Sequence, residues 1–211
     1  MMTMACEGSL LDSEEDEADA TESFADCDTL TVEYDLSGSQ FEIRDTPLGA
    51  GDATNEIGPG RLRIQFAYDG EKRLEGAVKL VEYSNAMQFV VSNVETNMLA
   101  TSGPDDCGVA DGEYQGNRIE WATPVRDYHS RGDVTCNAGE IVCGLANLPD
   151  GEPAPRDTTT DQPLEDFQFE DDGSFAMDWV EIPNEDSGNT FLSLEGRETI
   201  RVCGSQPDCA N

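Results

Sequence analysis

The sequence predicts an all-β protein, an antiparallel meander of about nine or ten strands that forms a β-sandwich or an up-and-down barrel. Three observations predict this class. Many short segments alternate apolar and polar residues, turn-forming residues separate these segments, and no segment repeats its apolar residues at helical spacing over three turns. The chain has 211 residues, enough for one folded domain. We expect residues 1–28 to be an acidic, disordered tether and residues 29–211 to be a single all-β domain.

The expected tether is a run of acidic and small residues. Residues 7–28 read EGSLLDSEEDEADATESFADCD, and the first basic residue of the chain is Arg44. The acids repel one another and there is little apolar surface to bury, so this segment is predicted to be extended.

The first expected strands are 29–36, 41–45 and 61–68, in which every second residue is apolar. The side chains expected to point inward are Leu30, Val32, Tyr34, Leu36, Phe41, Ile43, Leu62, Ile64, Phe66 and Tyr68. Residues 77–92 are apolar for longer, and we expect a tight turn at Ser84-Asn85 to divide them into two strands.

The later strands are expected within 112–122, 164–180 and 189–203. In the first of these, Ile119 and Trp121 fall on one face. Residues 164–180 form the clearest hairpin, because Phe167 and Phe169 precede the turn sequence Asp-Asp-Gly at 171–173. Phe175, Met177 and Trp179 follow that turn and are expected to point inward.

Three segments between these strands are expected to be long irregular loops, namely 45–60, 101–112 and 148–163. Loops of this length are commonly functional or disordered. The third carries four prolines and three threonines and is expected to be an exposed, semi-stiff excursion.

The seven cysteines indicate disulfide chemistry. The chain has no CxxC motif, and its close cysteine pairs do not have the spacing of zinc ligands. Disulfides require an oxidising compartment, so we expect an extracellular, outer-membrane-tethered or periplasmic protein. Six cysteines can pair in fifteen ways. The pairing expected from short loops is Cys136 with Cys143 and Cys203 with Cys209, which leaves Cys27 to Cys107.

Cys6 is the seventh cysteine and a candidate lipidation site. It follows the small residue Ala5 and precedes the acidic run, which is the arrangement of a lipid-bearing cysteine and its spacer in bacterial lipoproteins. Residues 1–5 contain neither a basic nor an apolar region, so a complete signal peptide is not seen before Cys6. The alternative is that Cys6 is an unlipidated thiol.

The charge limits the classes of partner. A formal net charge of −33 repels phosphate groups, so no nucleic acid is expected to bind, and contact with a membrane is expected only through a lipid anchor. A cationic or extracellular partner, divalent cations and self-assembly remain open. The simplest explanation of the charge is solubility or adaptation to salt.

No catalytic residue can be assigned. His129 is the only histidine and lies in a polar stretch without a GxSxG motif. Glu120 and Asp178 each lie beside a tryptophan, but strand alternation predicts that both carboxylates point outward. No cofactor is expected other than calcium, and the candidate ligands are Asp105, Asp106, Asp111 and Glu113, or Asp171 and Asp172. None of these fits an EF-hand loop, and Asp171-Asp172-Gly173 is more simply a turn.

Four stretches of the chain carry a family resemblance. They are YDLSGSQFEIRDTPLGAGD, IGPGRLRIQF, VKLVEYSNAMQF and SGPDDCGVADGEYQGNRIEW. Together they resemble a family of uncharacterised bacterial secreted or lipoprotein-like all-β proteins. The resemblance runs from about residue 35 to Cys143, resumes near LEGRETIRVC, and implies export and a cysteine framework but no activity.

The function expected from these features is that of a non-enzymatic, exported β-domain, tethered to a surface, with a binding or structural role. Three alternatives stay open. They are a lipocalin-like carrier of an apolar ligand, a secreted hydrolase that uses carboxylates, and a subunit of an extracellular assembly.

Overall fold

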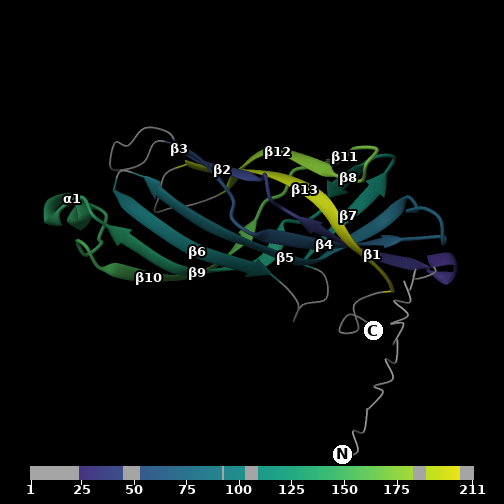
Figure 1. Cartoon of the computed structure of the whole chain (residues 1–211), viewed down its shortest axis with the longest axis horizontal. Coiled ribbons are helices and arrows are strands. Elements are labelled where there is room, and N and C mark those ends of the chain that lie inside the picture. The colour runs from purple at the N-terminus through teal and green to yellow at the C-terminus, as the bar shows by residue number, and fades with distance from the viewer. Residues whose placement is uncertain (1–23, 45–52, 92, 103–108, 183–188, 205–211) are drawn as a thin grey trace, which may run out of the picture.

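A computed structural model of the chain describes residues 24–44, 53–91, 93–102, 109–182 and 189–204 (Figure 1). Apart from a 3₁₀ turn and a short helix, the regular secondary structure of these residues consists of antiparallel strands of one large sheet. The architecture is sandwich-like and is not a closed barrel, so the predicted all-β class is confirmed.

The described residues form thirteen strands, more than the nine or ten that the sequence predicts. The main path of the sheet is β10-β9-β6-β5-β4-β1-β13-β12-β11-β8-β7, with β2 joined to β13 and to β3. The elements are η1 (Phe24–Asp26), β1 (Thr29–Asp35), β2 (Gln40–Arg44), β3 (Ala53–Glu56), β4 (Gly60–Ala67), β5 (Gly76–Val91), β6 (Val94–Ser102), β7 (Ala110–Gln115), β8 (Arg118–Trp121), β9 (Val125–Cys136), α1 (Glu140–Leu145), β10 (Pro153–Gln162), β11 (Phe167–Phe169), β12 (Phe175–Ile182) and β13 (Asn189–Cys203).

The strands divide into two regions that share β5. The first residues of β5 pair with β7, from Gly76↔Tyr114 to Leu80↔Ala110, whereas its later residues pair with β6. We call residues 86–102 and 129–160 the arm; they include β6, α1, most of β9 and β10, and the end of β5. The remaining strands form the body. In Figure 1 the arm ends at α1, at the opposite end of the long axis from β1.

The body holds the main hydrophobic core, and aromatic rings fill much of it. Phe167 and Phe175 stack with ring centroids 4.2 Å apart, and Tyr34 meets Phe175 edge-on at 5.2 Å. Such pairs add about 0.5–1.5 kcal/mol beyond the area they bury. Gly196 lies opposite Phe175 in the ladder, and a Cβ atom there would come within 1.9 Å of the phenyl ring. A side chain at this position would therefore displace a core aromatic residue.

The predicted inward faces of the first strands are confirmed. All ten side chains expected to point inward between Leu30 and Tyr68 are buried. The predicted hairpin is also confirmed, because Phe167 pairs with Met177 and Phe169 with Phe175 across the turn. Alternation therefore identified these strands because one face of each packs on the core.

Three predictions about local structure are wrong. No turn occurs at Ser84-Asn85, and β5 continues through both residues because Asn85 is buried and hydrogen-bonded there. Trp179 is 41% exposed, because a register shift between Met177 and Val180 turns it away from the core. Most of the expected third loop is the edge strand β10, paired with β9 along nearly its whole length.

The described residues contain two disulfides, and one of them was predicted. Cys136 and Cys143 are joined as expected, with Cα atoms 5.7 Å apart. Cys203 is joined to Cys27, with Cα atoms 5.5 Å apart, so the pairings Cys203–Cys209 and Cys27–Cys107 are corrected. The start of β1 lies beside the end of β13, with Leu30 opposite Cys203, and this brings the two sulfur atoms together. Cys6, Cys107, Cys209 and the tether up to residue 23 lie outside the described residues.

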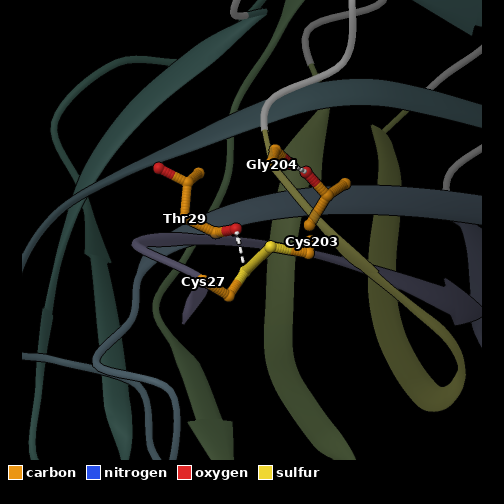
Figure 2. The surroundings of a disulfide bond; sticks show 5 residues. Cys27, Thr29, Cys203 and Gly204 are labelled. Atoms are coloured by element: carbon orange, nitrogen blue, oxygen red, sulfur yellow. Dashed lines mark hydrogen bonds between the residues drawn. A yellow bond between two sulfur atoms is a disulfide. The ribbon is translucent and has the colours of Figure 1, made fainter. Parts of the chain in front are cut away.

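Figure 2 shows how the Cys27–Cys203 disulfide is held. The Cys27 sulfur lies 2.8 Å from the carbonyl oxygen of Thr29. The backbone N–H of Gly204 donates to that same oxygen at 2.7 Å, and the Thr31 hydroxyl donates to the Gly204 carbonyl at 2.9 Å. The chain just before β1 is thereby joined, covalently and by hydrogen bonds, to the end of β13.

Candidate functional site

His129 lies on β9, where its side chain reaches across to β10. Its Nε2 atom is 2.5 Å from Oδ1 of Asp157 and 3.0 Å from Nε of Arg131. The hydrogen bond from His129 lowers the pKa of Asp157. Neighbouring strand residues point to opposite faces, so Ser130 is directed away from this group. The group links two strands on the exposed surface and does not form a nucleophile–base pair.

The carboxylates considered for catalysis do not come together. Glu120 and Asp178 are both exposed, which confirms that they point outward. Asp111 pairs with Arg126 at 3.1 Å. None of these three acids is buried.

The candidate calcium ligands are also separate. Oδ1 of Asp172 accepts hydrogen bonds from the backbone N–H and hydroxyl of Ser174, at 2.9 and 2.6 Å, so this segment is a turn, as the simpler interpretation has it. These hydrogen bonds lower the pKa of Asp172. Within the described part of the chain no three His, Cys, Asp or Glu side chains are placed to hold a metal ion, and Asp105 and Asp106 lie outside that part.

Most arginine side chains form ion pairs with carboxylates of the same chain. Arg63 pairs with Glu33 at 2.7 Å and with Glu82 at 3.1 Å, which links β1, β4 and β5. Arg73 lies over the Phe66 ring at 4.5 Å and pairs with Glu198 at 2.8 Å. In all, eight of the ten arginines make ion pairs: Arg44, Arg61, Arg63, Arg73, Arg118, Arg126, Arg131 and Arg201. The charge that remains toward solvent is therefore strongly acidic.

A buried polar cluster lies where the arm meets the body. Nδ2 of Asn85 donates to the Tyr83 hydroxyl at 2.9 Å, and the Tyr128 hydroxyl donates to Oδ1 of Asn85 at 2.9 Å. Nε2 of Gln162 approaches the Tyr83 hydroxyl at 3.5 Å. Burial raises the pKa of Tyr83 to about 12 and that of Tyr128 well above its ordinary value. Both phenols are neutral at ordinary pH, so this cluster joins the arm to the body and supplies no acid or base.

The tip of the arm is a separate small unit, which we define as residues 136–152. Cys136, Cys143 and Leu148 form its buried centre, and Val94, Val134 and Ala154 pack against them. Two backbone hydrogen bonds close the tip: Leu148 N–H donates to Cys143 O at 3.0 Å, and Gly151 N–H donates to Cys136 O at 2.7 Å. Oδ1 of Asp150 accepts from Gly139 N–H at 3.0 Å. The disulfide and these bonds hold a helix of six residues that would not form alone.

The helix of the tip presents apolar residues to solvent. Ile141 is 84% exposed and Leu145 is 80% exposed, although both are large and aliphatic. Residues four apart lie on the same helix face, so they form one apolar surface opposite the buried Cys143. Val142, which is 36% exposed, lies beside them. Among the described residues this is the candidate interaction surface.

Sequence reasoning missed this surface. The residues EIVCGL contributed to the prediction only through the spacing between Cys143 and Cys136. The available signal was the position of three large aliphatic residues around a disulfide cysteine, in a segment too short to bury them all.

Comparisons with known proteins place no further constraint on this site: no family model, curated protein or solved structure matches the chain. None of the helices among the described residues has the length and apolarity needed to cross a membrane.

Proposed function

We propose that this protein is an exported, non-enzymatic β-domain that is tethered near its N-terminus and binds a partner through the arm. The observation that carries the proposal is the pair of disulfides, one in the body and one in the tip. Structural disulfides persist in oxidising compartments, which favours a location outside the cytosol. Cys6 and the acidic run after it supply a candidate lipid anchor and spacer, in keeping with the family resemblance.

The shape of the molecule supports a binding role. The described chain begins at one end of the long axis, near β1, and α1 lies at the other end (Figure 1). A tether attached before β1 would hold the body toward a surface and direct the tip away from it. The aromatic core of the body gives less support to a carrier of apolar ligands, because large rings occupy the interior.

The test is the intact mass of the protein isolated from its own cells, with and without reduction and thiol alkylation. We expect an acylated chain that begins at Cys6, and alkylation of Cys27, Cys136, Cys143 and Cys203 only after reduction. An unlipidated chain with intact disulfides would contradict the lipid anchor but would still support export. A chain whose four cysteines are alkylated without reduction would overturn the proposal.

A second candidate function, a subunit of an extracellular assembly, is favoured by β10. This strand has ten residues and pairs only with β9 among the described strands, so one of its edges is open. Proline cannot donate to a ladder, so Pro153 and Pro155 protect the first part of the edge, whereas the threonine run at 158–160 does not. Sedimentation velocity tests this function: assembly through β10 predicts oligomers that Thr159→Pro abolishes, and a monomer at all concentrations contradicts it.

A further inference from the structure

We infer that the tip of the arm docks into an apolar pocket rimmed by Lys or Arg on a partner protein. The inference rests on the proposed function, because it gives a chemistry to the partner that the arm would bind. Ile141 and Leu145 are the apolar anchors, and the carboxylates of Glu140 and Glu152 are the charged rim.

The exposure of the anchors is not a requirement of the fold. The tip already has a buried centre in Cys136, Cys143 and Leu148, and the anchors lie on the other side of the helix. Polar residues at 141 and 145 would leave every contact of that centre in place. Exposed aliphatic residues gathered in this way mark interaction surfaces on soluble proteins.

The tip is also held in one conformation before binding. The Cys136–Cys143 bond closes a short loop, and the hydrogen bonds of Gly139 and Leu148 fix the helix within it. Little conformational freedom is then lost when the anchors are covered, so more of the contact energy appears as affinity.

The charge around the anchors selects the chemistry of the partner. Residues 137–155 contain Glu140, Asp150 and Glu152, all exposed, and no Lys or Arg. A basic rim would complement this surface and speed association. The net charge of −33 makes a second copy of the chain or an anionic membrane a poor occupant of the same site.

The experiment measures binding of a synthetic helical peptide with one leucine face and lysines elsewhere, by isothermal titration calorimetry with the oxidised full chain. The matched probe replaces every lysine with glutamate. We expect the lysine peptide to bind and the glutamate peptide not to bind. The double variant Ile141→Ser/Leu145→Ser should weaken binding at least about tenfold, because a few buried anchor residues carry most of the binding energy of an interface. Glu140→Gln/Glu152→Gln should weaken it less and flatten its salt dependence.

A control variant distinguishes binding at the tip from general attraction of a basic peptide to an acidic protein. Ile200 and Val202 are about half exposed on β13, outside the arm. Ile200→Ser/Val202→Ser should leave the affinity unchanged, and circular dichroism with peptide mapping of the disulfides should show each variant folded and oxidised.

Three outcomes would overturn the inference. The first is equal peptide affinity for the wild type and the Ile141→Ser/Leu145→Ser variant. The second is self-association that this variant abolishes, which would assign the tip to a second copy. The third is binding of phosphatidylcholine vesicles, lost in the same variant, with no binding of the lysine peptide. The intact-mass experiment on the protein from its own cells tests export without using the tip. Failure of the proposed export can therefore be distinguished from failure of the proposed docking of the tip.

Discussion

The body and the arm are made from the same antiparallel ladder, but they are stabilised in different ways. In the body, strands pack over a common core, and residues such as Tyr34, Leu62 and Phe167 have almost no exposed surface. In the arm, Thr96, Met98 and Val134 are only half-buried, and the small buried centre lies at the tip. Burial organises the body, whereas most of the arm beyond its base, where Phe89 packs on Phe41 and Ala100 is buried, depends on the cross-link at its tip. A surface that must reach a partner can project from a domain in this way without weakening its core.

The largest expected effect comes from the disulfide of the body. Cys27 and Cys203 are 176 residues apart in the sequence, and closing a loop of that length removes roughly 5 kcal/mol of entropy from the unfolded chain. Cys27→Ser/Cys203→Ser should therefore lower the free energy of unfolding by about that amount. Urea unfolding followed by tryptophan fluorescence measures it. An unchanged midpoint, or a Cys203–Cys209 bond in peptide mapping of the wild type, would contradict the assignment.

A smaller effect is expected at the junction of the two regions when the pH rises. Burial raises the pKa of Tyr83 from 10.0 to about 12, so the folded state favours the neutral phenol. Stability from this group is fully present below pH 10 and is lost as the pH rises toward 12. The loss is about 3 kcal/mol for two pKa units.

The measurement is urea unfolding at several alkaline pH values, with tyrosinate absorbance recorded in parallel. Tyr83 and Tyr128 should ionise only as the protein unfolds. Tyr83→Phe should flatten the pH dependence, although it leaves Asn85 Nδ2 without its acceptor and costs about 1–3 kcal/mol at neutral pH. If both tyrosines ionise near pH 10 in the folded protein, the junction is not closed to water.

The smallest of the three effects belongs to the disulfide of the tip. Cys136 and Cys143 are only seven residues apart, and the same entropy relation gives about 2–3 kcal/mol. In Cys136→Ser/Cys143→Ser we expect this loss to be local. Hydrogen exchange should become faster in residues 136–155 and stay unchanged in β1, β4 and β13. A uniform increase over the whole sheet would show that the two regions unfold as one unit.

Much of the body could be predicted from the sequence, and less of the arm. Strands such as 61–68 alternate because one face packs on a core, and that pattern is local. Asn85 resembles a turn residue, but it is buried in the strand, where Tyr83 and the sequence-distant Tyr128 satisfy its amide. Cys203 has a near neighbour in Cys209 but lies beside Cys27 in the sheet, a contact that spacing cannot reveal. The helix of the tip was missed because a disulfide stabilises it, and its six residues are too few to show a helical repeat of apolar residues.

The bond between Cys27 and Cys203 also determines how the domain would bear a mechanical load. A pull on the chain before residue 27 would reach β13 through the sulfur atoms, without first separating β1 from β4. The covalent link would share the load with a strand that pairs with β1, β2 and β12, near the centre of the sheet. A domain anchored near its N-terminus and pulled at α1 would therefore resist peeling of its first strand, and reduction would remove that resistance.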